Sequence, residues 1–506
     1  MLKSLWKEGD PHMPNAQQVK SYFDILARAL RVVEDFSGNK QEIFALRNSL
    51  EISLDTRSFL SSAFELDGEA FLREIDRFVS AIEDEDNTDK FIKATTMCQF
   101  LDEKISYSDS CKGTFSVFSS ISIYSNNVVV LDEPLNRNYK EVGICINPRL
   151  PVSFLYTEDE QQDYPHRLFN RDGYMGINGD LNNISYIKWD ESLSVINIIV
   201  PNDFSKEKSA RFKIAFSPLS NRKDLLYTDT TKIQRGGTSY TGEFLKKLNY
   251  STELYNSFCG AWSMACKANA NIFFAPEMLC TENMFTTEND YNCLMRRMSL
   301  KKLSLGESPP DITITPSFWR KNNNSCQIIY QDGEVLGEQF KFNPYINKKK
   351  HCMESLKIIE KKEIILLHIP GVHRIVVMIC SDFLSNQESW LENIICKQLL
   401  PSLILVPSFS PGEQDFINSL SIAKRYGASV IWGNCCGAKT NGENQIGGCG
   451  IVGCDSIMRF KEVNECGLTC DGTQSCLFTI DLPLKLTGNK EKDKIYLKHL
   501  LNSDKI

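Results

Sequence analysis

The sequence contains no apolar run long enough to cross a bilayer. A membrane-spanning helix needs about 20 consecutive apolar residues, whereas the longest runs here, such as residues 403–407, have the length of a strand. The first ten residues carry acidic side chains and no apolar segment, so they do not have the pattern of a signal peptide. We therefore expect a protein that is neither embedded in a membrane nor secreted.

Histidine is scarce, and some common site motifs are missing. Only six histidines occur. His368 and His373 precede Cys380 in an expected strand or turn, where a structural role is more common, and no protease-type signature surrounds this cysteine, so a Cys/His protease is the weaker alternative. The Gly236-Gly237 loop lacks the Gly-Lys-Ser/Thr ending of a phosphate-binding loop, which leaves nucleotide binding with little support.

What is present is the composition of a large globular protein. The 506 residues are 42% hydrophobic and 24% charged, and a chain of this length predicts two or three domains. The net charge of −7 argues against nucleic-acid binding by the surface as a whole, although binding by a local basic patch stays an alternative. The basic run 348–350 is interpreted as a solvated loop.

Cysteine is abundant, with 18 residues. Because no secretory signal accompanies them, we expect mostly reduced thiols and a cytoplasmic location. Within one C-terminal stretch, the spacings of Cys449 with Cys454 and of Cys466 with Cys470 suit zinc ligands. The same residues also suit small buried apolar positions, so a structural metal is an alternative and no cofactor is predicted. The stretch contains Cys435, Cys436, Cys449, Cys454, Cys466, Cys470 and Cys476.

The N-terminal part divides into a helical region and a β-rich region. Between residues 1 and 108, apolar residues such as Tyr22, Leu26 and Val33 recur at helical spacing, which predicts a small helical bundle. From 109 to 205 the apolar runs are β-branched and alternate with polar residues, which predicts strands. No motif in the β-rich region indicates an activity, and packing against its neighbours is the simplest role.

The C-terminal part has the pattern of an α/β domain. Over residues 206–486, strand-like runs such as 212–216 and 271–276 alternate with longer helical stretches such as 253–268, so helices are expected to cover a sheet. Residues 487–506 form a charged tail, which we expect to be one helix or a flexible end.

Three residues capable of acyl chemistry each follow an apolar run in the α/β region. Glu277 follows a strand-like run that ends in proline, Lys341 follows an Asp-Gly turn and a second run, and Cys380 follows five apolar residues. A thiol with a pKa near 8.5 is mostly protonated at neutral pH and needs a base or a cation nearby. Glu277 would take its proton. Lys341 would favour the thiolate and, with the backbone N–H of Ser381, bind an oxyanion formed by attack on a carbonyl or nitrile carbon.

These segments resemble those of the carbon–nitrogen hydrolase, or nitrilase, superfamily in order and spacing. The resemblance covers about residues 210–485. It rests on the Pro-Glu strand end at 276–277, the asparagine-led strand, Asp-Gly turn and lysine of 324–341, the Gly-x-x-Arg-Ile run into Cys-Ser-Asp at 371–382, the Leu-Val-Pro-Ser strand end at 405–408, and closing elements at 431–434, 447–450 and 478–482.

The resemblance implies an α/β fold in which a nitrilase-like α-β-β-α sandwich follows the helical and β-rich segments. It implies Glu277 as base, Lys341 as oxyanion partner and Cys380 as nucleophile in the hydrolysis of a non-peptide C–N bond, in an amide or nitrile, through a thioester or thioimidate. Many members carry a second glutamate between the lysine and the cysteine; Glu354 is the candidate and Glu360 competes. The family needs no metal and commonly pairs through the sandwich, so a homo-oligomer is implied.

The sequence also departs from the family pattern, and a second hypothesis stays open. Ser381 replaces a bulkier or acidic residue, and 383–386 lacks the usual pocket-shaping residues, so the reaction class is better supported than any substrate. The N-terminal 200 residues are outside the resemblance. They favour a nitrilase-like domain that acts as a non-catalytic assembly or recognition module of a larger system, such as antiphage defence, with a protein partner bound through the N-terminal region. The complete set of Glu277, Lys341 and Cys380 favours the enzyme.

Overall fold

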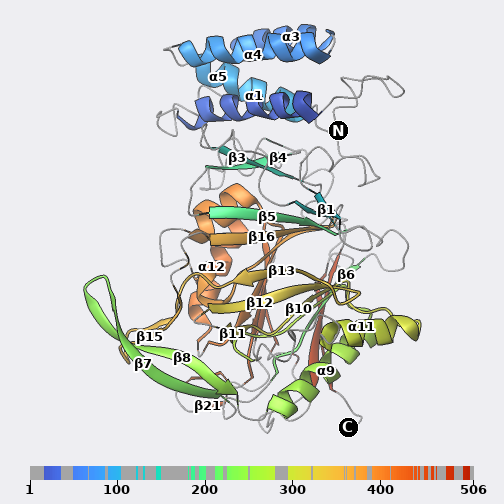
Figure 1. The fold of residues 1–506 in the computed structure, drawn as a ribbon, viewed down its shortest axis with the longest axis vertical. Helices are drawn as coiled ribbons and strands as arrows, with labels where there is room; N and C mark the ends of the chain where they lie inside the picture. The colour runs from blue at the N-terminus through green and yellow to red at the C-terminus, as the bar shows by residue number, and fades with distance from the viewer. Residues whose placement is uncertain are drawn as a thin grey trace.

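The structure of the protein is a computed structural model (Figure 1). It describes residues 16–35, 50–66, 68–85, 89–103, 121–123, 129–131, 144–149, 181, 184–188, 193–200, 211–219, 225–248, 251–279, 294–320, 323–357, 359, 362–369, 372–384, 390–410, 412–436, 438–440, 443–444, 450–453, 457–460, 463, 475–483 and 494–501. Most of the region 109–205, for which strands are predicted, lies outside these residues.

Four helices at the N-terminal end pack into a bundle, as predicted. They are α1 (Ala16–Glu34), α3 (Leu50–Phe64), α4 (Gly68–Asp84) and α5 (Asp89–Glu103). Apolar residues at helical spacing, including Tyr22, Leu26 and Ile75, are completely buried in one shared core. The Tyr22 hydroxyl donates to the Leu101 carbonyl at 2.5 Å and joins α1 to α5.

A two-stranded sheet lies between the helical bundle and the rest of the molecule (Figure 1). It pairs β3 (Ile144–Pro148) with β4 (Ile184–Lys188) in antiparallel register. Ile144 and Ile184 belong to the core of the helical bundle. The Asp102 carboxylate of α5 accepts a hydrogen bond from the Ile184 N–H at 3.0 Å, so this small sheet is fastened to the helices.

The largest sheet has nine strands and collects segments from both halves of the chain. Its order is β1 (Ile121–Ile123), β2 (Val129–Leu131), β5 (Leu193–Ile199), β16 (Lys362–Ile369), β17 (His373–Val377), β18 (Leu403–Ser408), β19 (Ser429–Asn434), β22 (Gly450–Gly453) and β23 (Ile457–Arg459). Strands β17, β18 and β19 run parallel, as do β5 and β16. Because β1, β2 and β5 come from the β-rich region, the predicted boundary at residue 205 does not coincide with an edge of this sheet.

A second sheet has eight strands. Its order is β11 (Phe318–Arg320), β12 (Asn323–Tyr330), β10 (Ile312–Ile314), β9 (Ile272–Phe274), β6 (Arg211–Phe216), β24 (Cys476–Pro483) and β25 (Tyr496–Leu501), and β13 (Val335–Phe340) pairs with β12. The expectation of a helix or a flexible end for the tail is wrong at β25. Leu497 and His499 are buried between exposed neighbours, which is the two-residue period of a strand, and β25 pairs with β24.

The two sheets share one apolar core, and helices pack on their outer faces. The core contains residues of both sheets, such as Phe216 of β6 and Ile431 of β19, together with Phe416 of α12 (Gln414–Arg425). The π-helix η8 (Trp390–Leu399) joins α12 on the nine-stranded sheet. Helices α9 (Ser251–Lys267) and α11 (Leu294–Ser304) cover the eight-stranded sheet. The fold is therefore mixed α/β, and its assignment to the nitrilase-like sandwich stays a prediction.

A third sheet projects from the side of the molecule at the lower left of Figure 1. It consists of β14 (Ile346–Asn347), β15 (Cys352–Glu354), β8 (Thr238–Leu248) and β7 (Leu225–Arg235), in that order. Strands β7 and β8 form a long hairpin, and β15 runs parallel to β8 from Thr241 to Glu243. We call this four-stranded sheet the ribbon. A short pair, β20 (Lys439–Thr440) and β21 (Glu443–Asn444), stands apart from the three larger sheets.

None of the helices described in the ranges above is long and apolar enough to cross a membrane.

Candidate active site

The structure brings four of the predicted site residues together in one buried cluster. Glu277 lies three residues after β9, Lys341 directly follows β13, Glu354 ends β15, and Cys380 begins a short 3₁₀ helix, η7 (Cys380–Asp382), beyond β17. Each is at most 6% exposed. The competing glutamate, Glu360, lies outside the described residues.

Lys341 lies between two carboxylates. Its ammonium nitrogen is 2.5 Å from Glu277 Oε1 and 2.6 Å from Glu354 Oε2. Burial alone lowers the pKa of Lys341, but the two carboxylates outweigh it and hold this pKa well above its ordinary value. Burial raises the pKa of Glu354, and Lys341 opposes that rise. Two of the three ammonium hydrogens are used by the carboxylates, which leaves one for another acceptor.

Asn324, at the start of β12, holds the two carboxylates in place. Its Nδ2 donates to Glu277 Oε1 at 2.8 Å and to Glu354 Oε1 at 3.2 Å. Its Oδ1 accepts a hydrogen bond of 2.6 Å from Ser317, whose oxygen in turn accepts the Met278 N–H. The sequence showed this asparagine as the start of a strand, but its contact with both glutamates depends on the tertiary structure.

Cys380 is a neutral thiol in this environment. Burial and the nearby Glu277 carboxylate raise its pKa well above the ordinary value, and the opposing effects of Lys341 and Ser408 are smaller. Lys341 lowers the pKa of Cys380, as expected, but burial and Glu277 raise it by more. Ser408 at the end of β18 donates to Sγ at 3.1 Å, and the Glu277 carboxylate is near enough to raise the pKa of the thiol. Deprotonation therefore requires a base, and Glu277 is the nearby carboxylate.

The backbone at Cys380 adopts a conformation that favours glycine. Its φ is +49°, in the left-handed region that costs a side-chain-bearing residue on the order of 1 kcal/mol. This turn ends the extended chain beyond β17 and begins η7. The N–H groups at the start of a helix have no acceptor within that helix, so the Ser381 N–H is not used inside η7.

The second oxygen of Glu277 is fixed by the loop after β18. Glu277 Oε2 accepts the Phe409 N–H at 3.0 Å. Asn434, at the end of the neighbouring β19, makes two bonds of 2.8 Å to the backbone of Ser410 and holds that loop. Both carboxylate oxygens of Glu277 are therefore held by donors.

Asp382 and Ser381 connect the cysteine turn to the segment after Lys341. The Asp382 carboxylate accepts the N–H groups of Phe342 and Asn343 at 2.7–3.1 Å, and the Ser381 hydroxyl donates to the Asn343 carbonyl. The Ser381 side chain is thereby used in this connection, and only its backbone belongs to the reacting site. Burial raises the pKa of Asp382 to about 7, against the attraction of Lys341.

His368 and His373 take structural positions. Both are buried, and burial lowers the pKa of each to about 3, with a smaller contribution from Arg374 at His368. His368 Nε2 lies 2.9 Å from the Asn197 side-chain oxygen, and His373 Nδ1 lies 3.0 Å from the Ser402 hydroxyl. A histidine of this kind is not a base for Cys380, and the protease alternative receives no support from either contact.

Within the described parts of the chain, no three His, Cys, Asp or Glu side chains are grouped so that they could hold a metal ion. Of the cysteine stretch considered above, Cys435, Cys436 and Cys476 are among those residues and carry free thiols. Cys449, Cys454, Cys466 and Cys470 lie outside them.

Comparisons with known proteins give distant structural similarity. No protein-family model and no curated protein matches the sequence. A mutant of the Nesterenkonia AN1 amidase from the nitrilase superfamily is 12% identical over 55% of this chain and 92% of its own, with a TM-score of 0.34. A second structure of an amidase from Nesterenkonia sp. is 12% identical over 56% and 94%, with a TM-score of 0.33. The glutamine-dependent NAD⁺ synthetase from Acinetobacter baumannii is 14% identical over 58% of this chain and 48% of its own, with a TM-score of 0.32. At this level of similarity a shared activity does not follow.

Proposed function

We propose that this protein hydrolyses a non-peptide C–N bond, in an amide or a nitrile, with Cys380 as the nucleophile. The observation that supports it is the buried cluster in which Lys341 lies between Glu277 and Glu354, near the Cys380 thiol whose pKa Glu277 and Lys341 both influence. A base, an ammonium group and a thiol in one buried cluster are the groups that such a reaction uses. Isolation of the cluster from water strengthens each of these interactions.

In the first half of the reaction, Glu277 accepts the thiol proton as Cys380 Sγ bonds to the substrate carbon. For an amide, the carbonyl π electrons move to oxygen, and the free hydrogen of the Lys341 ammonium group and the Ser381 N–H donate to this oxyanion. The intermediate then collapses, the C–N bond breaks, and Glu277 returns the proton to the departing nitrogen. An amine or ammonia leaves, and an acyl thioester remains on Cys380.

In the second half, Glu277 takes a proton from a water molecule that attacks the thioester carbon. The C–S bond breaks, and the proton returns to Cys380, which releases the carboxylic acid and restores the thiol. For a nitrile, the Glu277 proton goes to the nitrogen as the thioimidate forms. One water adds to the thioimidate, the C–N bond breaks and ammonia leaves, and a second water then hydrolyses the thioester as described above. Glu354 and Asn324 hold Lys341 and Glu277 in position throughout, since they contact these residues and not Cys380.

The direct test is ammonia release from a panel of small aliphatic and aromatic amides and nitriles. Cys380→Ala should lower the rate by at least about 10³-fold, because no other group in the site forms the covalent intermediate. Glu277→Gln should lower the rate to a similar degree. Its amide accepts from Phe409 but cannot take the thiol proton.

Cys326→Ala serves as the control, since Cys326 is a buried thiol on β12 that lies outside the reacting site. Its rate should stay within a few-fold of the native chain. Native ammonia release by the folded Cys380→Ala protein would overturn the mechanism, and no release by the native chain from any compound in the panel would favour the non-catalytic alternative.

A further inference from the structure

The ribbon is a basic surface on an acidic protein. Its strands and turns, residues 225–248 and 342–354, contain seven lysine and arginine residues and three acidic residues, of which Glu354 is buried in the site. Lys232, Lys348, Lys349 and Lys350 are exposed, and none of the four makes an ion pair with another described residue. The run 348–350 is an exposed turn, in agreement with the predicted solvated loop. Pairing of β15 with β8 places this turn beside the hairpin.

The opposite charge is concentrated in the helical bundle. Residues 65–103 contain twelve acidic and four basic residues, more net negative charge than the whole chain. Five exposed acidic residues line α4 and the turn before it, and we call them the acidic face: Glu65, Glu69, Asp76, Glu83 and Asp84. The face ends at Glu83 and Asp84, at the negative end of the α4 dipole, which adds to the local negative potential.

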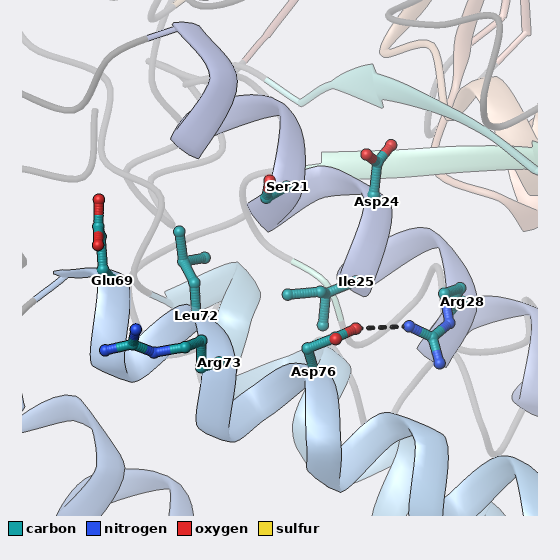
Figure 2. A pocket seen from close by; sticks show the side chains of 8 residues that line it. All are labelled: Ser21, Asp24, Ile25, Arg28, Glu69, Leu72, Arg73 and Asp76. Carbon is teal, nitrogen blue, oxygen red and sulfur yellow. Dashed lines mark hydrogen bonds and ion pairs between the residues drawn. The ribbon is translucent and has the colours of Figure 1, made fainter.

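A pocket opens into the acidic face between α1 and α4. Figure 2 shows Asp24 and Arg28 on α1 opposite Glu69, Arg73 and Asp76 on α4. The pocket has a volume of about 380 Å³. Arg28 is bound to Asp76 at 2.6 Å and to Glu83, so these charges offset one another. The remaining charged residues of the recess are Asp24, Glu69 and Arg73, and the recess therefore keeps one net negative charge, which favours the end of a cationic side chain.

The two surfaces lie far apart in one molecule. In Figure 1 the helical bundle is at the top and the ribbon projects at the lower left, with the large sheets between them. A ribbon cannot reach the acidic face of its own chain, whereas that of a second copy can. Contacts of this kind are heterologous and join subunits head to tail into a ring or an open filament.

We propose that the ribbon of one copy binds the acidic face of another copy. The lysine turn 348–350 and Lys232 supply the positive charge, and the acidic face with its pocket receives them. Contacts between oppositely charged surfaces raise the association rate and the specificity for the partner more than they raise the affinity. The complex is therefore sensitive to salt, because the Debye length falls from about 30 Å at 0.01 M to about 8 Å at 0.15 M salt. This contact does not depend on the proposed hydrolysis.

Sedimentation velocity of the full chain over a range of concentrations, at low and at physiological salt, tests the proposal. The native chain should sediment as larger species at low salt and dissociate as salt is added. Two reversed variants should stay monomeric: Lys348→Glu with Lys350→Glu on the ribbon, and Glu69→Lys with Asp84→Lys on the acidic face. Each should raise the dissociation constant at least about tenfold, the equivalent of about 1.4 kcal/mol.

The decisive samples combine the two reversals. An equimolar mixture of the two variants, and one chain carrying all four substitutions, should associate again because opposite charges once more face each other. Lys301→Glu with Lys498→Glu changes the net charge by the same amount as the ribbon variant, at exposed positions outside both surfaces, and should associate like the native chain. Far-UV circular dichroism confirms that each variant is folded.

Three results would overturn the proposal. The first is a native chain that is monomeric at low salt. The second is association of either reversed variant at native strength, and the third is failure of both combined samples to associate after the single variants have dissociated. Loss of association in the Lys301 and Lys498 control would show an effect of net charge alone and would count equally against it.

Discussion

At the residue scale, the Cys380 thiol is held neutral by its surroundings. Its pKa is raised by burial and by Glu277, and only Lys341 and Ser408 oppose the rise. Ser408 donates directly to Sγ at 3.1 Å, and this hydrogen bond favours the thiolate. The balance between proton retention and thiolate formation rests on these few contacts.

Ser408→Ala should slow the reaction of Cys380 with iodoacetamide. A hydrogen bond to a charged group contributes about 1.5–3 kcal/mol, so its loss should lower the rate at neutral pH about tenfold or more and shift the pH dependence upward. The rate is measured by peptide mass spectrometry of the alkylated residue. Ser421→Ala on the exposed side of α12 is the control and should react as the native chain does. Equal rates in all three proteins would show that Ser408 does not affect the reactivity of Cys380.

Asp382 makes stability depend on pH. Burial raises its pKa to about 7 from 3.8, so between these values the folded chain holds a proton that the unfolded chain releases. The free energy of unfolding therefore falls as the pH rises from about 4 to about 7. Asp382→Asn keeps an acceptor oxygen for Phe342 and Asn343 without the charge.

The native chain should consequently lose roughly 2–4 kcal/mol more stability between pH 5 and pH 8 than Asp382→Asn does. Urea unfolding at the two pH values measures the difference. If both proteins lose the same amount, Asp382 is already ionised at pH 5 in the folded chain.

The sequence alone could place Glu277, Lys341 and Cys380 at the ends of predicted strands, since apolar runs mark buried strands. It could not reveal Asn324 and Ser408 as their partners, because those contacts join β12 to β9 and β18 to the cysteine turn across 28 to 47 residues of sequence. The sequence offered both Glu354 and Glu360 as the second glutamate and gave only their positions to choose between them. In the structure, Glu354 forms an ion pair with Lys341. Polar contacts between distant strands depend on sheet order, which local pattern does not contain.

At the scale of elements, the two large sheets approach closely where β19 crosses β6. A Cβ atom added at Gly433 would lie 2.4 Å from the ring of Phe216, which is completely buried. A ring fixed in a packed core cannot move aside at low cost. This glycine therefore sets the distance between the sheets that carry Cys380 and Glu277.

Gly433→Ala should lower the free energy of unfolding by about 1–3 kcal/mol through overpacking. Gly412→Ala is the matched control, since its added methyl group meets nothing within 4 Å, and it should change stability by less than about 0.5 kcal/mol. Urea unfolding compares the two. An equal effect of both substitutions would mean that Phe216 can move and that the spacing of the sheets is not fixed here.

One strand, β15, connects the ribbon with the candidate site. Glu354 is the last residue of β15 and pairs in register with Glu243 of β8. The same strand therefore reaches from the projecting hairpin to the ammonium group of Lys341. Strands of two or three residues, such as β14 and β15, carry too few residues to show a period in the sequence, so the sequence does not reveal that they join the hairpin of β7 and β8.

At the scale of the whole molecule, a polar chain joins the N-terminal unit to the nine-stranded sheet. His368 of β16 contacts Asn197 of β5 at 2.9 Å, and the Asn197 amide donates to Asn147 of β3 at 3.0 Å. All three residues are buried. Because the Asn197 oxygen is the acceptor, His368 Nε2 is the donor and the ring is neutral in the folded chain.

The molecule should consequently lose stability in acid through His368. Its pKa is about 3 when folded and 6.5 as an ordinary group, so the unfolded chain binds the proton first and stability falls as the pH drops from about 6.5 toward 3. His368→Gln, which retains a donor, should lose at least about 1 kcal/mol less between pH 7 and pH 4. His351→Gln in the exposed lysine turn should follow the native chain. Identical acid profiles for all three would show that His368 is protonated in the folded state.

The sequence by itself determined the helical bundle, the main strands and helices of the α/β region and the three chemical groups, because periodic burial and strand-end polar residues are local properties. Only the tertiary structure decided that β1, β2 and β5 join the nine-stranded sheet and that the tail forms β25. It also decided that Asn324, Ser408 and Asp382 hold the site, and that basic and acidic surfaces lie at separate ends. Each of these depends on which distant segments pack together, and that choice is made by the burial of both large sheets in one core.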